Sequence, residues 1–259
     1  MPYRLPEPSD KAAYLREKFD EIARCYDLFN DLITQGMHRH WKNTLIKRLE
    51  LPAGATGLDL CCGTGDLAAR GRDRLGGEGA LYALDFSRNM LEIARHRLTD
   101  KDGGNGPGLL LLCGDAMRLP FRDGSLDFVT VGYGLRNVSG LKSCLAEIFR
   151  VLAPGGMLAS LDVGEVRLPW LRPLAQFYFF KVVPLIGRML QPGQEMFSYL
   201  PHSTRDYPAQ QDSGNRRISV WGLGDSSGAQ AREPGRLRII ESGCIPGPAG
   251  DCRAPKPPR

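Results

Sequence analysis

Short apolar runs alternate with longer amphipathic stretches through the middle of the chain, from Gly57 onward. The apolar runs read GLDLCC, ALYALDF, LLLLCGD, DFVTVGYG and MLASLDV, and the amphipathic stretches read LAARGRDRL, NMLEIARHRL and LKSCLAEIFRVL. Short apolar strands that alternate with helical patterns of about 10–15 residues indicate βαβ units and a parallel sheet. The sequence therefore predicts an α/β fold, a Rossmann-like sheet with helices on both faces, whose ligands bind at the carboxyl ends of the strands.

The segments on either side of this core follow other patterns. Residues 1–50 mix apolar and charged positions at helical spacing over most of their length, which predicts an N-terminal helical cap. After the predicted α/β core at residues 51–165, residues 166–210 are aromatic and punctuated by proline, and we expect a lid or substrate-binding insertion there. Residues 211–259 are rich in Gly, Pro and Arg and have almost no periodic apolar positions. We expect a disordered tail, because such a segment buries too little surface to offset chain entropy.

Composition narrows the class of protein. The chain has 259 residues, of which 42% are hydrophobic, and a net charge of +5. The basic residues are not gathered into a block, so the charge gives little support to nucleic-acid binding, while an anionic membrane surface is compatible with it. The seven cysteines form no CxxC pairs, which favours a reduced, cytoplasmic chain, and no metal site is predicted. The nearest approach to a membrane span is Phe177–Leu190, which Lys181, Pro184 and Arg188 interrupt.

The stretch LDLCCGTGD ends the first predicted strand in a glycine-bracketed turn. Gly63 and Gly65 let a ligand approach the backbone, but Asp59 and Asp66 place carboxylates beside it. A phosphate loop would carry a Lys after its last Gly, and a dinucleotide site would carry a third Gly where Ala68 stands. The acids disfavour both, because they repel phosphate. The remaining interpretation is a cationic, adenosine-like ligand without phosphate, and S-adenosylmethionine fits through its sulfonium and ammonium groups.

Acids also close the next two predicted strands. Asp85 ends ALYALD, where a carboxylate can accept both ribose hydroxyl protons. Asp115 and Ala116 follow LLLLCG, where a carboxylate and a backbone N–H can meet an adenine ring. Each acid alone is as well explained by a helix cap or a loop, but three at successive strand ends favour a cofactor site. The predicted cofactor-binding residues are Asp59, Gly63, Thr64, Gly65, Asp85, Asp115, Ala116 and Gly132.

Together these stretches resemble the class I S-adenosylmethionine-dependent methyltransferases. A closer resemblance is to the ubiquinone/menaquinone biosynthesis C-methyltransferase family, whose signature YDxMNxxxSxxxHxxW is similar to YDLFNDLITQGMHRHW at residues 26–41. The family's GLRN stands at residues 134–137, and its RVLKPGGxLxxxE is similar to RVLAPGGMLASLD at residues 150–162. Its YLPxSxxxFP is similar to YLPHSTRDYP at residues 199–208. The resemblance covers roughly residues 14–210.

Beyond residue 210 the resemblance ends. The family continues with a helix, an EAGF-like turn and a closing β-hairpin, and nothing in residues 211–259 is similar to these. We therefore expect a frameshifted or substituted C-terminus, with the last two strands of the sheet missing or altered and an unpaired sheet edge left exposed.

The resemblance implies methyl transfer from S-adenosylmethionine to a ring carbon of a prenylated hydroquinone. Demethylmenaquinol is the favoured acceptor. The ring carbon becomes nucleophilic when the neighbouring hydroxyl loses its proton, and an unperturbed phenol titrates at a pKa of about 10. The site therefore needs a cation or a base near that hydroxyl. The residues assigned to this chemistry are Arg136 for the cation, Asn137 for the second ring oxygen, His38 for the proton, and Tyr26 and Tyr199 for positioning the ring.

Several alternatives stay open on the sequence. The acceptor could be the benzoquinol of the ubiquinone branch or another small phenol, and the altered C-terminus is compatible with an inactive, cofactor-binding scaffold. Arg136 could form a surface ion pair, and His38 could cap its helix. The apolar stripe Phe177–Leu190 could be core, although a long isoprenoid tail favours a lid with peripheral membrane contact. A homo-oligomer is also an open alternative.

Overall fold

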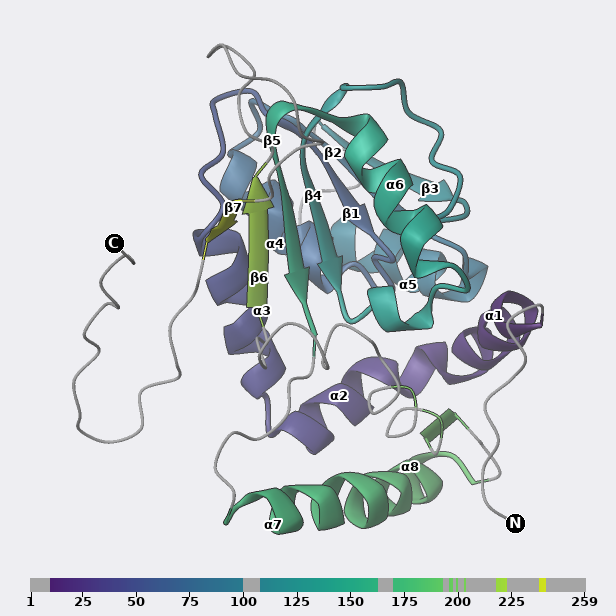
Figure 1. Cartoon of the computed structure of the whole chain (residues 1–259). Helices are drawn as coiled ribbons and strands as arrows, with labels where there is room; N and C mark the ends of the chain where they lie inside the picture. The colour runs from purple at the N-terminus through teal and green to yellow at the C-terminus, as the bar shows by residue number, and fades with distance from the viewer. Residues whose placement is uncertain are drawn as a thin grey trace.

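The computed structural model describes residues 10–99, 108–162, 170–192, 196–197, 199, 203, 218–222 and 238–240. Within these ranges the centre of the molecule is a seven-stranded sheet with the order β3-β2-β1-β4-β5-β6-β7 (Figure 1). Strands β1 to β5 are parallel to one another, which confirms the predicted Rossmann-like α/β fold. The bounds are β1 (Thr56–Leu60), β2 (Ala80–Asp85), β3 (Leu109–Cys113), β4 (Leu126–Gly132), β5 (Leu152–Leu161), β6 (Ile218–Gly222) and β7 (Arg238–Ile240).

Helices cover both faces of the sheet, as the sequence predicts. Helices α3, α4 and α5 lie on one face, and α6 lies on the other (Figure 1). Because side chains alternate between the faces of a strand, Val129 and Val131 of β4 pack with α6, whereas Phe128 packs with α3 and α4. The bounds are α3 (Met37–Lys47), α4 (Asp66–Leu75), α5 (Arg88–Thr99) and α6 (Leu141–Val151), with a short 3₁₀ turn, η2 (Leu135–Asn137), after β4.

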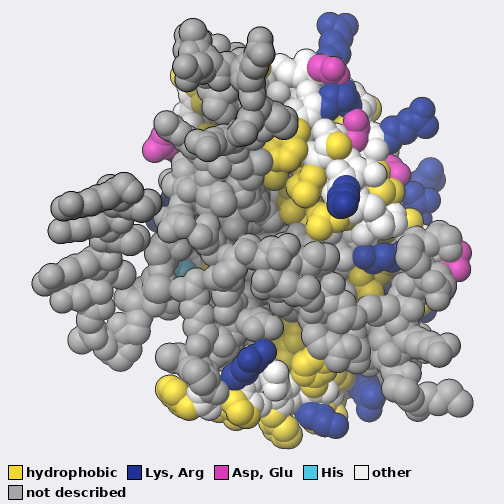
Figure 2. All heavy atoms as spheres, in the orientation of Figure 1, with side chains coloured by type: hydrophobic (Ala, Val, Ile, Leu, Met, Phe, Trp, Pro, Cys, Tyr) yellow, Lys and Arg dark blue, Asp and Glu magenta, His cyan; other side chains and the backbone are white. Residues whose placement is uncertain are grey.

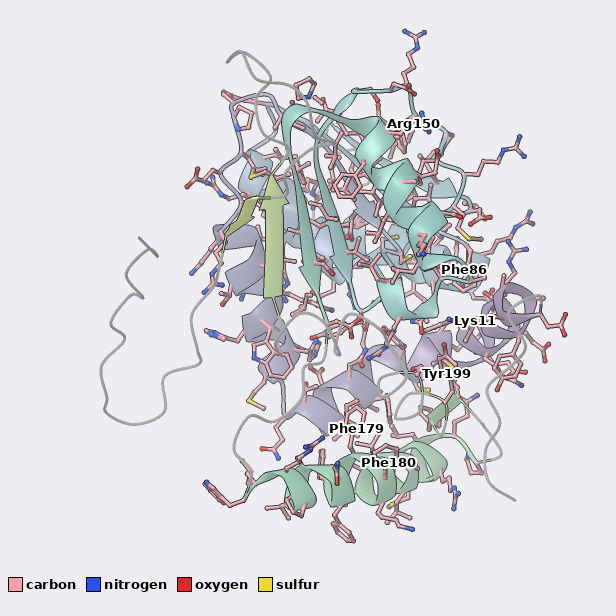
Figure 3. The ribbon with its side chains drawn as sticks, in the orientation of Figure 1. Lys11, Phe86, Arg150, Phe179, Phe180 and Tyr199 are labelled. Carbon is pink, nitrogen blue, oxygen red and sulfur yellow. The ribbon has the colours of Figure 1, made fainter. Side chains whose placement is uncertain are left out.

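The N-terminal helices and the segment after β5 form one further layer below the carboxyl edge of the sheet (Figure 1). Its core buries Phe29 from the N-terminal side against Val183, Phe197 and Tyr199 from the later segment, and Figure 3 shows Tyr199 on the side of this layer toward the sheet. None of the helices in the described ranges combines the length and apolar character needed to cross a bilayer. The layer consists of α1 (Lys11–Ile22), η1 (Ala23–Cys25), α2 (Tyr26–Thr34), α7 (Arg172–Phe177), the π-helical turn η3 (Tyr178–Val182) and α8 (Val183–Leu190).

The sequence left two expectations for the last two strands of the sheet, that they are missing or that they are altered. The structure excludes the first, because β6 pairs antiparallel with β5 and β7 pairs antiparallel with β6. Main-chain hydrogen bonding can add a strand to a sheet edge with little help from an apolar pattern, which is why composition gave no signal for these strands. The rest of residues 211–259, and with it the predicted disordered tail, lies outside the described residues.

Candidate active site

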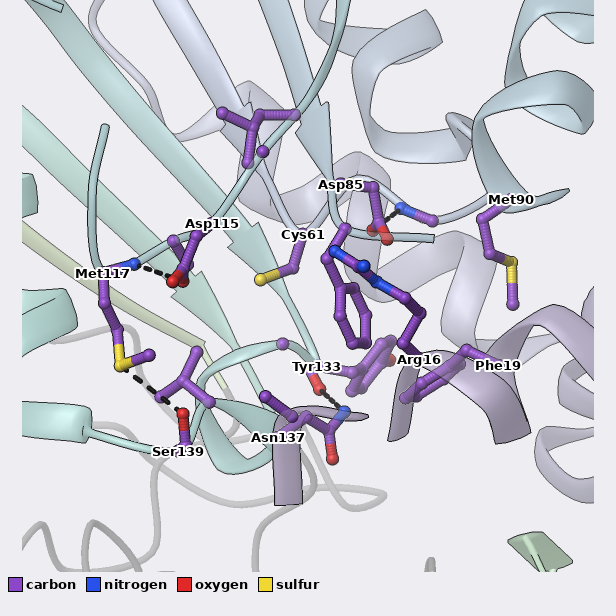
Figure 4. A pocket seen from close by; sticks show the side chains of 18 of the residues that line it. Arg16, Phe19, Cys61, Asp85, Met90, Asp115, Met117, Tyr133, Asn137 and Ser139 are labelled. Carbon is purple, nitrogen blue, oxygen red and sulfur yellow. Dashed lines mark hydrogen bonds between the residues drawn. The ribbon is translucent and has the colours of Figure 1, made fainter. Parts of the chain in front are cut away.

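A cavity of about 300 Å³ lies at the carboxyl edge of the sheet, between the strand ends and helix α1 (Figure 4). Its wall is mostly apolar, with contributions from Phe19, Met90 and Met117. Segments far apart in the sequence therefore meet where the strand order predicts a ligand. The predicted site residues found in this wall are Tyr26, Gly63, Asp85, Asp115, Ala116, Gly132 and Asn137.

A smaller cavity of about 30 Å³ adjoins the first, and Gly63 and Gly132 line both. Asp59 and Thr64 line the smaller cavity. The Asp59 side chain is buried, and its Oδ1 accepts a hydrogen bond from the Thr130 hydroxyl at 2.9 Å, while its Oδ2 has no partner among the described residues. Burial raises the pKa of Asp59 to about 7. A buried carboxylate oxygen without a partner fits a cationic ligand group.

Asp85 closes β2 with its carboxylate held by backbone donors. The N–H of Gly63 donates to its Oδ2 at 2.8 Å, and the N–H of Ser87 donates to its Oδ1 at 2.9 Å. The side chain is almost fully buried yet lines the larger cavity, and burial raises its pKa to about 6. The Gly63 bond fixes the glycine turn against the end of β2, and each carboxylate oxygen keeps a lone pair for a further donor.

Asp115 lies across the larger cavity from Asp85 (Figure 4). Its Oδ1 accepts a hydrogen bond from the N–H of Met117 at 2.9 Å, which orients the carboxylate at the rim. Ala116 is buried beside it and lines the same cavity. The two acids therefore face one another across a mostly apolar space, whose wall also includes the polar side chains of Arg16, Asn137 and Ser139.

Two of the predicted cofactor residues, Thr64 and Gly65, contact other parts of the protein from the glycine turn. Gly65 lines neither described cavity; its φ is +76°, and a Cβ there would lie 2.9 Å from the Cβ of Ala94, so this glycine lets α4 approach α5. The hydroxyl of Thr64 donates to Asp27 Oδ1 at 2.7 Å, and Arg97 hydrogen-bonds both Thr64 and Asp27. This network ties the turn to α2 and α5.

Asn137 and Tyr199 bring two of the family-like segments together. The Tyr199 hydroxyl donates to Asn137 Oδ1 at 3.2 Å, and Asn137 Nδ2 donates to the Tyr133 carbonyl at 3.2 Å. Asn137 lines the larger cavity, as does Tyr26. Burial raises the pKa of Tyr199 to about 12 and also raises the pKa of Tyr26. Both phenols are therefore protonated at neutral pH, so they can donate hydrogen bonds and pack but cannot serve as bases.

Arg136 is not among the residues that line either described cavity. Its Nη1 donates to Asp162 Oδ1 at 3.2 Å, and the two side chains are only 8% and 12% exposed. The ion pair is therefore partly buried and does not lie on the open surface. Arg136 also lies close enough to Tyr26 and Tyr199 to oppose the rise in their pKa.

His38 also lies outside the lining of both described cavities. It is buried in the first turn of α3, and its Nε2 lies 2.8 Å from Asp31 Oδ1. Burial lowers the pKa of this imidazole despite the carboxylate. The residue that precedes α3 is Gly36, so His38 does not cap the helix either; it joins α3 to α2 through Asp31.

Three residues of the site are not among those that the sequence predicts. Tyr133 and Cys61 line both cavities, and their φ angles of +62° and +56° are uncommon outside glycine and mark tightly constrained turns. The position of Tyr133 between two glycines at the end of β4 was a signal that could have identified it. Lys42 lines the smaller cavity and donates to Asp66 Oδ2 at 2.9 Å. It comes from α3, which no strand-end pattern connects to the site.

Comparison with known proteins decides the family. The model of a family described as the ubiE/COQ5 methyltransferase family matches residues 8–216, which is most of the chain. The chain belongs to the ubiE/COQ5 methyltransferase family. It is an S-adenosylmethionine-dependent methyltransferase, as this family is, so the predicted family, enzyme class and cofactor are confirmed.

Two relatives are similar over most of the chain, and one solved structure is similar over about half of it. A demethylmenaquinone methyltransferase of Leptospira interrogans is 46% identical over 213 residues, which cover 81% of this chain and 84% of that protein. A ubiquinone/menaquinone biosynthesis C-methyltransferase of Stenotrophomonas maltophilia is 38% identical over 210 residues, covering 81% and 82%. Among solved structures, a SAM-dependent methyltransferase from Aquifex aeolicus is 24% identical with a TM-score of 0.44, covering 49% of this chain and 66% of that one.

The site of this ubiE/COQ5 family member has groups that fit S-adenosylmethionine. Asp59 Oδ2, which has no partner among the described residues, offers a buried carboxyl oxygen in the smaller cavity, and an ammonium group beside it would favour the charged carboxylate. At Gly63, which lines both cavities, a Cβ would have no neighbour within 4 Å, so open space borders the backbone there. When bound, the cofactor supplies a methyl group on a positively charged sulfur, which is electrophilic.

Proposed function

We propose that this methyltransferase methylates a ring carbon of a prenylated hydroquinone, with demethylmenaquinol as the favoured acceptor. The observation that carries the proposal is the contact between Tyr199 and Asn137 at the wall of the larger cavity. It joins the YLP segment and the GLRN turn, two stretches that resemble the quinone C-methyltransferases outside the cofactor motifs. The 46% identical relative named demethylmenaquinone methyltransferase supports the same acceptor.

We propose that the cofactor spans both cavities. Asp59 would pair with its ammonium group, because that carboxylate oxygen has no partner among the described residues. Asp85 would accept the ribose hydroxyl protons, while Asp115 and the backbone at Ala116 would meet the adenine. Gly63 and Gly132 line both cavities and would border the methionine portion. Thr64 and Gly65 would act indirectly, by holding the turn in place.

The acceptor ring would lie in the larger cavity against Tyr26 and Asn137. The acceptor hydroxyl would lose its proton to solvent, which raises electron density at the neighbouring ring carbon. That carbon would take the methyl group as the sulfur–methyl bond breaks and leaves its electron pair on sulfur. The ring C–H proton would then be lost and a proton would return from solvent to the ring oxygen, which restores the hydroquinone. The buried Arg136 would lower the pKa of the acceptor hydroxyl at a distance, as it does for the two tyrosines. Holding carbon, methyl and sulfur in line would supply much of the acceleration.

The prenyl tail of such an acceptor is too apolar for water. We therefore also propose that the acceptor stays partly in a bilayer and that the enzyme contacts the membrane peripherally from the cytoplasmic side.

The test is methyl transfer from labelled S-adenosylmethionine to a short-chain demethylmenaquinol kept reduced, beside the oxidised quinone and a benzoquinol of the ubiquinone branch. Transfer to reduced demethylmenaquinol and not to the oxidised quinone is expected, because only the reduced form has a hydroxyl proton to lose. Transfer to the benzoquinol with equal efficiency would extend the acceptor to both branches. Cofactor binding without any transfer would overturn the proposal and leave the inactive scaffold.

A further inference from the structure

The outer face of α7, η3 and α8 carries a row of exposed apolar side chains. Figure 2 shows hydrophobic and basic side chains together along the lower edge of the molecule, where Figure 1 places these helices. Single exposed apolar residues are ordinary, but a row of large ones on one element marks an interaction surface. The members, here called the outer stripe, are 57–77% exposed: Trp170, Leu174, Phe177, Leu185 and Met189.

The opposite face of the same helices packs against the rest of the protein. Val183 and Gly187 are buried, and a Cβ on Gly187 would lie 2.1 Å from Cγ of Phe197, so α8 is pressed against the core. The Tyr178 hydroxyl donates to the Ile33 carbonyl at 2.9 Å, which joins η3 to α2. A helical segment that is apolar on both faces normally packs against other groups on both faces. Here the described residues cover only the inner face.

The π-helical turn aligns the outer stripe. In an unbroken α-helix, Met189 of α8 would point about 120° away from Phe177 of α7. The turn at Tyr178–Val182 has wider, i→i+5 hydrogen bonding, which slows the rotation along the helix. The exposed positions of α8 therefore come into line with those of α7, and the row becomes one continuous surface.

Charge decides what covers this surface. Lys181 and Arg188 are exposed on the same helices, and residues 170–192 contain three basic residues and no Asp or Glu. In a symmetric contact with a second copy, these basic residues would face one another and repel. An anionic bilayer provides both an apolar boundary for the stripe and negative headgroups for the cations.

We propose that the outer stripe docks the enzyme on an anionic bilayer surface, with its apolar side chains at the acyl boundary and Lys181 and Arg188 among the headgroups. The role of this docking rests on the proposed function, since docking would bring the active site to a prenylated acceptor held in the bilayer. Lipid binding itself needs no acceptor, so the docking surface and the proposed function can be tested separately.

The experiment is vesicle flotation of the full chain with phosphatidylcholine vesicles that contain or lack phosphatidylglycerol. The wild type is expected to float with the anionic vesicles. The variant L174Q/F177Q/M189Q should bind at least about tenfold more weakly, and K181Q/R188Q about fivefold more weakly for each charge removed. Gln keeps helix propensity high, and L110T, at an exposed leucine of β3, is the matched control and should bind like the wild type.

Methyl transfer to a water-soluble, short-chain acceptor and the cofactor Kd should be unchanged in all variants, which shows that they are folded. Absence of wild-type flotation, or flotation unaffected by L174Q/F177Q/M189Q, would overturn the docking inference. A wild-type dimer that this variant converts to a monomer would also overturn it in favour of a second copy. Intact flotation without transfer to any short-chain quinol would refute the proposed function and leave the docking surface standing.

Discussion

The hydroxyl of Tyr199 donates a hydrogen bond to Oδ1 of Asn137, 62 positions earlier in the chain, at 3.2 Å. The bond fixes which way the Asn137 amide faces, because its Nδ2 in turn donates to the Tyr133 carbonyl. The orientation of Asn137 in the cavity wall therefore depends on Tyr199, which is fully buried and does not itself line the cavity.

Tyr199→Phe should lower kcat by about three- to tenfold, because loss of one hydrogen bond of about 1 kcal/mol frees the Asn137 amide. The cofactor Kd should not change, since the bond lies on the acceptor side. Steady-state kinetics and calorimetry separate the two. Tyr178→Phe is the matched control: it removes the bond to the Ile33 carbonyl, away from both cavities, and should affect stability without affecting kcat. Equal kinetic effects in the two variants would refute the positioning role.

Asp59→Asn should weaken cofactor binding by about 10- to 100-fold, because a charge-assisted bond is replaced by a neutral one. The Thr130 hydroxyl can still donate to the Asn oxygen, so the fold is retained. Asp127→Asn is the control, because Asp127 accepts the N–H of Thr56 at 2.7 Å and lines neither described cavity. Binding measured by titration calorimetry should distinguish them, and equal affinities for Asp59→Asn and the wild type would contradict the ammonium assignment.

The stability of the ligand-free protein should respond to the raised pKa of Asp59. Because the folded-state pKa is about 7 and the unfolded value is about 4, the folded state binds the extra proton between these limits. Stability should therefore fall as pH rises through this window, by up to about 1.4 kcal/mol for each pH unit. Denaturant unfolding of wild type and Asp59→Asn from pH 5 to pH 8 tests this, since the variant should lack this part of the slope. Identical pH slopes would contradict it.

Asp27 and Arg97 should be energetically coupled through Thr64. Both side chains are partly exposed, so a double-mutant cycle with Asp27→Ala and Arg97→Ala should give a modest coupling of about 1 kcal/mol. The cofactor Kd should rise in each single variant, because the network holds the glycine turn. The exposed pair Glu92 and Arg95 is the control, and no measurable coupling is expected there. A cofactor Kd unaffected by all variants would show that the turn holds its shape without α2.

His38→Asn should keep methyl transfer within about fivefold of the wild type, because the imidazole lies outside the lining of both described cavities. The variant should instead lose thermal stability, as should Asp31→Asn, since each removes the bond that joins α2 to α3. Kinetics and melting curves of the two variants provide the test. A loss of more than about 100-fold in kcat for His38→Asn alone would restore the sequence prediction of a catalytic base.

Most of the core could be predicted from the sequence because its signals are local. Short apolar runs and amphipathic stretches gave the parallel strands and the helices on both faces, and acids at strand ends gave Asp59, Asp85 and Asp115, each of which lines one of the two cavities. The residues that were misplaced or missed depend on distant neighbours. Gly65 meets α5 rather than a ligand, His38 turns to Asp31, and Lys42 reaches the smaller cavity from α3.

The sequence by itself determined the sheet, the position of the ligand edge and the family, because apolar periodicity, turn glycines and short signatures are encoded in neighbouring residues. Only the tertiary structure decided which polar groups are paired. It buried Arg136 against Asp162, left Asp59 Oδ2 without a described partner, and aligned the outer stripe through a π-helical turn. Pairing and burial decide the charge state of a side chain and which groups it can contact. Pairing and burial in turn depend on contacts between distant segments, which no local pattern encodes.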